Sequence, residues 1–89
     1  MQLQLTTEIW KKDSWFVVKC RELDFVTQGV TIEESKKNLL EVIDIQFEEM
    51  VETGTLHDYL AECGYSIKND IAVSRNEMVG FEKYAVQVG

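Results

Sequence analysis

Three residues of this chain, Cys20, Cys63 and His57, are of types that carry out nucleophilic catalysis or bind zinc. The two cysteines stand far apart with no C-x-x-C pair, so a zinc-binding spacing is missing. The spacing of His57 and Cys63 places them well off a common helical face, and no third orienting group is identifiable. A disulfide between the cysteines stays open as an alternative, but two buried free thiols are the prediction.

Carboxylates are far more abundant in this chain than cysteine or histidine side chains. The chain has 16 acidic and 9 basic residues, which gives a formal net charge of −7. This balance argues against unaided binding to nucleic acid, which needs a basic footprint. It favours a basic partner, with plain solubility as the simpler alternative.

Many of these acids fall in one predicted helix. Thr31 is a good N-cap and Glu34 follows three residues later, so the pair predicts a capping box. Gly54 is a natural residue to end the helix, which we expect to span residues 31–53. Helical spacing predicts an apolar stripe facing a sheet, made of Leu39, Leu40, Ile43, Phe47, Met50 and Val51. The opposite side gathers Glu34, Glu41, Asp44, Glu48, Glu49 and Glu52.

The segments around this helix read mainly as strands. Alternation of apolar and polar residues predicts a strand over residues 2–10, and dense aromatic and β-branched residues predict another over 15–20. A third short strand is expected over 23–28, and a closing strand over 81–88. Between them, Leu56, Tyr59, Leu60 and Cys63 repeat at helical spacing, and Ile71–Val73 is open as a brief strand.

These elements predict an α+β fold. We expect an antiparallel sheet of three N-terminal strands plus a C-terminal strand, with one long and one short helix on one face (β-β-β-α-α-β). A chain of 89 residues is expected to form one domain, residues 1–89. It has no apolar run long enough for a membrane helix and no layout typical of a signal peptide, so we expect a cytoplasmic protein.

Residues 3–50 resemble the HicB antitoxin family, including its small stand-alone members. The match begins with Asp13-Ser14-Trp15-Phe16-Val17, passes through Cys20 and Glu22-Leu23, and reaches Val26-Thr27-Gln28-Gly29. Within the helix it continues at Thr31, Glu33-Glu34, Asn38-Leu39, Glu41, Ile43, Phe47 and Glu48. Weaker similarity follows at residues 60–65 and in the last predicted strand.

The resemblance implies a truncated ribonuclease H fold and a partner, the small basic toxin HicA, which cleaves messenger RNA and is inhibited by being covered. Many family members also carry a C-terminal DNA-binding module. Residues 66–89 read instead as a loop and a strand, so this departure argues against DNA binding. The Pro-Gly-Cys that usually precedes the V-T-Q-G sequence is also missing.

The fold likeness raises an enzymatic alternative, because ribonuclease H chemistry uses carboxylates that hold two divalent metals. The first predicted strand contributes only Glu8 and the second none, while the helical acids spread along one face. We therefore expect no catalytic residue, metal or cofactor.

The prediction is a protein-binding module that neutralises a HicA-like toxin through Glu41, Asp44, Ile45 and Glu48. Ile45 enters this set because it lies inside the acidic band. The alternative is a self-associating domain without a toxin, in which an exposed strand edge pairs with a second copy. In either case we expect a homodimer or higher homo-oligomer.

Overall fold

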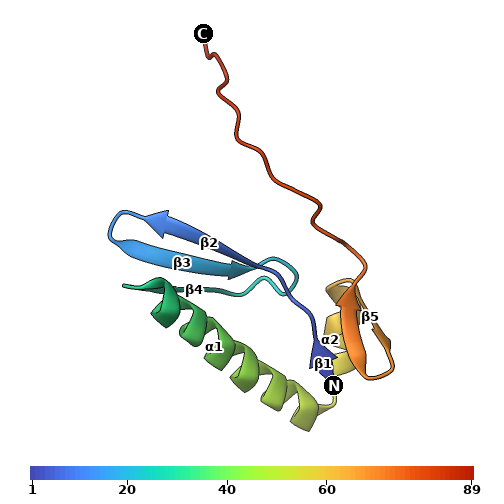
Figure 1. Cartoon of the computed structure of the whole chain (residues 1–89). Helices are drawn as coiled ribbons and strands as arrows, with labels where there is room; N and C mark the ends of the chain where they lie inside the picture. Colours follow the sequence, from blue (N-terminus) through green and yellow to red (C-terminus); the bar gives the residue numbers. More distant parts are fainter.

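The computed structural model describes the whole chain, residues 1–89, as an α+β protein with two small sheets and two helices (Figure 1). In chain order the elements are β1 (Gln2–Leu3), β2 (Thr7–Lys12), β3 (Trp15–Cys20), β4 (Val26–Gly29), α1 (Ile32–Thr53), α2 (Leu56–Glu62), β5 (Tyr65–Lys68) and β6 (Ile71–Ser74). The predicted α+β class is confirmed. The predicted single sheet is wrong, because the strands divide into two three-stranded sheets.

The first sheet is an antiparallel meander in the order β2-β3-β4. Lys12 pairs with Trp15 across a two-residue turn, in which Asp13 takes a left-handed φ of 56° that aspartate tolerates. On the other side of β3, Val18 pairs with Thr27. The predicted strand over residues 15–20 is confirmed, whereas the third strand begins later than expected, at Val26.

The second sheet has the order β1-β6-β5. Lys68 pairs with Ile71 across Asn69 and Asp70, and both turn residues have positive φ, of 51° and 61°, as a type I′ hairpin turn requires. β1 pairs parallel to β6, which places the N-terminal amine 3.0 Å from the Asp70 carboxylate. The expected strand over 2–10 is therefore split: its ends belong to different sheets.

Helix α1 begins with the predicted cap. The Glu34 amide donates to the Thr31 hydroxyl oxygen at 3.0 Å, while the Glu34 carboxylate accepts from the Val30 amide at 3.1 Å rather than from Thr31 itself. At the other end Gly54 adopts φ 71°, and the helix stops there as predicted.

Close contact between α1 and the first sheet depends on two small residues. The Ser35 hydroxyl lies 2.9 Å from the carbonyl oxygens of both Phe16 and Thr31, so it donates its one proton between them. A Cβ on Gly29 would lie 2.9 Å from the Ser35 hydroxyl oxygen, which leaves no room for a side chain at Gly29. The helix therefore packs directly on the backbone of β3 and β4.

The core lies between the two sheets and the helices. Its buried apolar side chains are Val18, Cys20, Leu23, Leu39, Ile43, Leu60, Tyr65 and Ala72. Two tyrosines connect parts that are distant in sequence: the Tyr59 hydroxyl donates to the Leu23 carbonyl at 2.9 Å, and the Tyr65 hydroxyl donates to the Gln4 carbonyl at 2.7 Å. These bonds fix α2 and β5 against the loops that flank the first sheet.

The predicted apolar stripe of α1 is only partly correct. Leu39 and Ile43 are buried and Phe47 packs against the core, but Leu40 and Val51 are exposed. Helix α1 packs on β3 and β4 of the first sheet and on α2, and these elements cover a narrower side of the helix than its apolar residues could fill.

The closing strand predicted over 81–88 is wrong. Residues 75–89 form no helix or strand, every one of them is exposed, and they run away from the body of the protein (Figure 1). β6, the strand that these residues follow, already pairs with β5 on one side and with β1 on the other, so they cannot pair with it.

The stability of the fold should depend on pH through the ionisation of Tyr59. Burial, above all, raises the pKa of Tyr59 to about 12, so the folded protein keeps this proton in a pH range where the unfolded chain, with a pKa near 10, loses it. We therefore expect the free energy of unfolding to fall as the pH rises from about 10 to about 12. The Tyr59→Phe variant lacks the hydrogen bond to Leu23 at every pH, so its free energy of unfolding should be lower by roughly 1 kcal/mol at neutral pH. Because phenylalanine does not ionise, the free energy of unfolding of the variant should fall less steeply as the pH rises.

Urea denaturation of both proteins between pH 8 and 11.5 measures this difference. Burial also raises the pKa of Tyr65, so some alkaline decline persists in the variant. Equally steep declines in the two proteins would contradict the role given to Tyr59.

Candidate functional site

The candidate site is the outward side of α1 in its C-terminal half. We call the carboxylates Glu41, Asp44, Glu48, Glu49 and Glu52 the acidic face; all of them are exposed. They lie there because Ser35, Leu39 and Ile43 turn toward the sheet, and the 3.6-residue period places the intervening positions in solvent. The predicted site residues Glu41, Asp44, Ile45 and Glu48 are thus brought together on one surface.

Very little positive charge neutralises this surface. The one ion pair on α1 joins Lys37 and Glu41, its nitrogen and oxygen are 4.0 Å apart, and both side chains are mostly exposed. Such a pair contributes little in water. Asp44, Glu48, Glu49 and Glu52 form no ion pair at all.

The position of these acids opposes helix stability. A helix C-terminus carries partial negative charge and favours cations, yet the last turn of α1 contains no basic residue. Asp44, Glu48 and Glu52 also follow one another at i,i+4, where like charges cost about 0.2–0.5 kcal/mol per pair. By contrast, Glu33 and Glu34 lie in the first turn, where the helix dipole favours them. Apart from the weak Lys37–Glu41 pair, the acidic face therefore does not stabilise the helix that carries it.

Exposed apolar side chains accompany the acids. Ile45 is 62% exposed and has Glu41, Glu48 and Glu49 one turn away on the same surface. Leu40, 56% exposed, and Val51, 64% exposed, border the acidic face beside Asp44. Sequence reasoning assigned Leu40 and Val51 to the core; the limited width of the elements packed on α1 leaves them on the surface.

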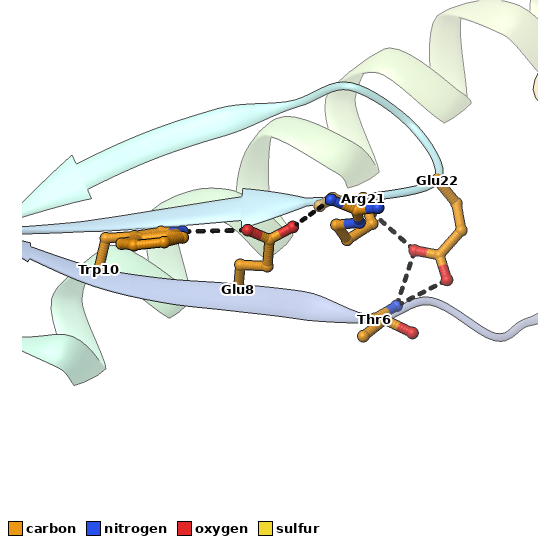
Figure 2. A network of polar contacts seen from close by, with 6 residues as sticks. Thr6, Glu8, Trp10, Arg21 and Glu22 are labelled. Atoms are coloured by element: carbon orange, nitrogen blue, oxygen red, sulfur yellow. Dashed lines mark hydrogen bonds and ion pairs between the residues drawn. The ribbon is translucent and has the colours of Figure 1, made fainter. Parts of the chain in front are cut away.

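A second polar cluster lies at the start of β2 (Figure 2). The Glu8 carboxylate accepts a hydrogen bond from the Trp10 indole nitrogen at 3.1 Å and lies 3.0 Å from an Arg21 guanidinium nitrogen. The Trp10 bond first, and Arg21 next, hold the pKa of Glu8 below its usual range. Beside it, the Glu22 carboxylate accepts the Thr6 amide at 2.8 and 3.1 Å. These contacts join β2 to the turn after β3.

The two cysteines and the histidine, the residues first considered for catalysis or zinc binding, do not form a common site. Cys20 is buried and free, and burial raises the pKa of its thiol; Cys63 is also free and half-buried. His57 is exposed on α2. No three side chains among histidine, cysteine, aspartate and glutamate are grouped so that they could share a metal ion.

Comparison with known proteins gives no relative: no family model, no curated protein and no solved structure matches the chain. Neither α1 nor α2 is long and apolar enough to cross a membrane.

The effect of these acids on the stability of α1 can be measured by reversing one of their charges. Glu52→Lys places a cation at the C-terminus of α1 and next to Glu48, so we expect the free energy of unfolding to rise by about 0.5 kcal/mol at low salt. The matched control is Glu33→Lys, which reverses an acid in the first turn and is expected to lower stability by a similar amount. Urea denaturation at low salt and at 1 M salt, where both effects shrink, is the measurement. A destabilised Glu52→Lys variant would show that the acidic face supports the fold.

Proposed function

We propose that this protein is a non-enzymatic binding module that neutralises a small basic, messenger-RNA-cleaving toxin of the HicA type by direct contact. The observation that carries the proposal is the acidic face of α1, where four of the five carboxylates form no ion pair and the charges near the C-terminus oppose helix stability. Charge that is unfavourable for folding is accounted for by a partner of opposite charge. The resemblance of residues 3–50 to HicB antitoxins supplies the class of that partner.

In this account the two kinds of residue on the surface act differently. The carboxylates attract a basic partner from a distance and raise the association rate. Ile45, Leu40 and Val51 then lose their water in the contact, and this apolar burial slows dissociation. A toxin that binds RNA through a basic surface would meet the acidic face in place of its substrate. Both proteins would act in the cytoplasm, where messenger RNA is available.

Two other functions compete with this proposal. A self-associating domain without a toxin would use the exposed apolar residues but leaves the acidic face without a role. A DNA-binding regulator would need basic side chains gathered on one surface, whereas the exposed outer side of α1 is acidic. A test for a basic protein partner therefore separates the three.

Co-expression with a small basic HicA-like toxin is the first test. We expect the protein to restore growth that the toxin arrests and to purify as a complex with it. The control is the toxin expressed with the Glu41→Lys, Asp44→Lys, Glu48→Lys triple variant, which should protect less well. Binding weaker than about 1 μM at low salt, together with no growth rescue, would reject the antitoxin function.

Association kinetics test the role of the acidic face itself. The triple reversal at Glu41, Asp44 and Glu48 should lower the association rate constant at least about tenfold at low salt, with a smaller change in the dissociation rate constant. The difference should shrink as salt approaches physiological strength, where the Debye length is ~8 Å.

The matched control for these kinetics is Thr31→Ala. It removes the helix cap, worth about 1 kcal/mol of stability, but leaves every charge in place, so its association rate should equal that of the wild type. If the association rate constant of the triple variant is unchanged at low salt, the acidic face only keeps the protein solvated and does not recognise the toxin.

A further inference from the structure

No backbone hydrogen bond and no ion pair joins the C-terminal segment, Glu77–Gly89, to the rest of its own chain. The one hydrogen bond of this segment is local, from the Tyr84 hydroxyl to the Glu82 carboxylate. The Cα radius of gyration is 15.6 Å, against about 12 Å for a compact chain of this length. The segment is therefore an extended arm.

The composition of this arm is that of a strand. Beyond Met78, which is 43% exposed, its large apolar side chains are 76–94% exposed: Val79, Phe81, Tyr84, Val86 and Val88. β-branched and aromatic residues are the types that fit a sheet, and without proline every residue can donate an amide to a ladder. Five such side chains in water are a large apolar exposure for a chain with so small a core.

The same protein also has an unpaired strand edge. β2 pairs with β3 on one side only. The Arg21 amide donates to the Thr6 carbonyl, so the alternation of an antiparallel ladder turns the backbone groups of Thr7, Ile9 and Lys11 away from β3. The side chains along this edge are open too: Ile9 is 45% and Trp10 59% exposed.

The arm does not fill this edge within its own molecule. An open groove of about 1200 Å³ lies between them, lined by β2 residues on one side and by residues 76–83 on the other. No backbone hydrogen bond joins the arm to β2. The cartoon shows the arm running past the sheet and away from it (Figure 1).

We propose that residues 79–88 of a second copy of this chain enter the groove and add a strand to the free edge of β2, while the first copy returns its own arm to the second. A second copy is favoured because each molecule carries both an unpaired strand and an unpaired edge. Reciprocal exchange around a two-fold axis satisfies both and closes the assembly at a dimer. The main-chain bonds supply affinity without a preformed pocket, as in other additions of a strand to a sheet edge.

Local charge fits this pairing despite the overall charge of −7. β2 carries Glu8, Lys11 and Lys12, and residues 79–88 carry Glu82 and Lys83, so the two strands offer charges of both signs and no block of like charge. The dimer does not depend on the toxin and leaves the acidic face of α1 free, so this proposal and the antitoxin function can fail separately.

Proline substitutions in the arm test the dimer directly. Only alternate residues of a strand face its neighbour, so the single variants Ala85→Pro and Val86→Pro are both made; one of them removes a paired amide in any register. Because neither residue contacts the body of its own chain, the monomer should fold unchanged. The control is Val51→Ser, which removes an apolar side chain that is also mostly exposed, 64% against 76% for Val86, but lies on α1.

Sedimentation equilibrium of the protein alone between about 5 and 100 μM should give about twice the 10.3 kDa chain mass for the wild type and for Val51→Ser. At least one proline variant should be monomeric at concentrations where the wild type is dimeric. In hydrogen exchange, the amides of Thr7, Ile9 and Lys11 should be protected in the wild-type dimer and exchange about 100-fold faster in that variant.

Three results would each overturn the proposal. The first is a monomeric wild type throughout this range, and the second is a dimer that persists in both proline variants. The third is an arm that becomes protected only when a basic toxin is added, which would assign it to that partner.

Discussion

The small size of the core is the constraint on which the rest of this structure depends. Eight buried apolar side chains hold two three-stranded sheets and two helices together. With so few, the packing needs exact polar connections: Ser35 against the Phe16 carbonyl, Tyr59 against the Leu23 carbonyl and Tyr65 against the Gln4 carbonyl. Each satisfies a backbone group that would otherwise be costly to bury.

The same constraint leaves apolar side chains on the surface. The first sheet and α2 cover only one side of α1, so Leu40, Ile45 and Val51 face solvent among the carboxylates. The open edge of β2 leaves Ile9 and Trp10 exposed, and the C-terminal arm pairs with no strand of its own chain. We interpret these as two separate contact surfaces, one acidic and suited to a basic protein, the other made of backbone and suited to a second copy.

Local signals in the sequence predicted most of the elements. Thr31, Glu34 and Gly54 act through bonds within a few residues, so the ends of α1 could be predicted closely. The outward position of the predicted site, residues 41, 44, 45 and 48, followed from the same helical period. What could not be predicted depends on pairing between distant segments. The split of the first strand requires β6 as a partner for Gln2 and Leu3, and nothing in residues 2–10 encodes that choice.

The closing strand was predicted for a related reason. The sequence of residues 81–88 has the character of a strand, but β6, the strand before it, is paired on both sides, and residues 81–88 pair with no other strand of their own chain. Likewise, the exposure of Leu40 and Val51 depends on how wide the opposing elements are, which helical periodicity does not contain. The Asn69-Asp70 turn was the local signal for β5 that sequence reasoning passed over.

The central claim is that the outward surface of α1 recognises a basic protein. Titrating the isotopically labelled protein with a HicA-like toxin, and following each backbone amide by NMR, maps that contact residue by residue. We expect the largest changes at residues 40–52, centred on Ile45, with Thr7–Lys12 and residues 79–88 almost unchanged. Large changes confined to β2 or the C-terminal arm, with α1 unaffected, would contradict the account.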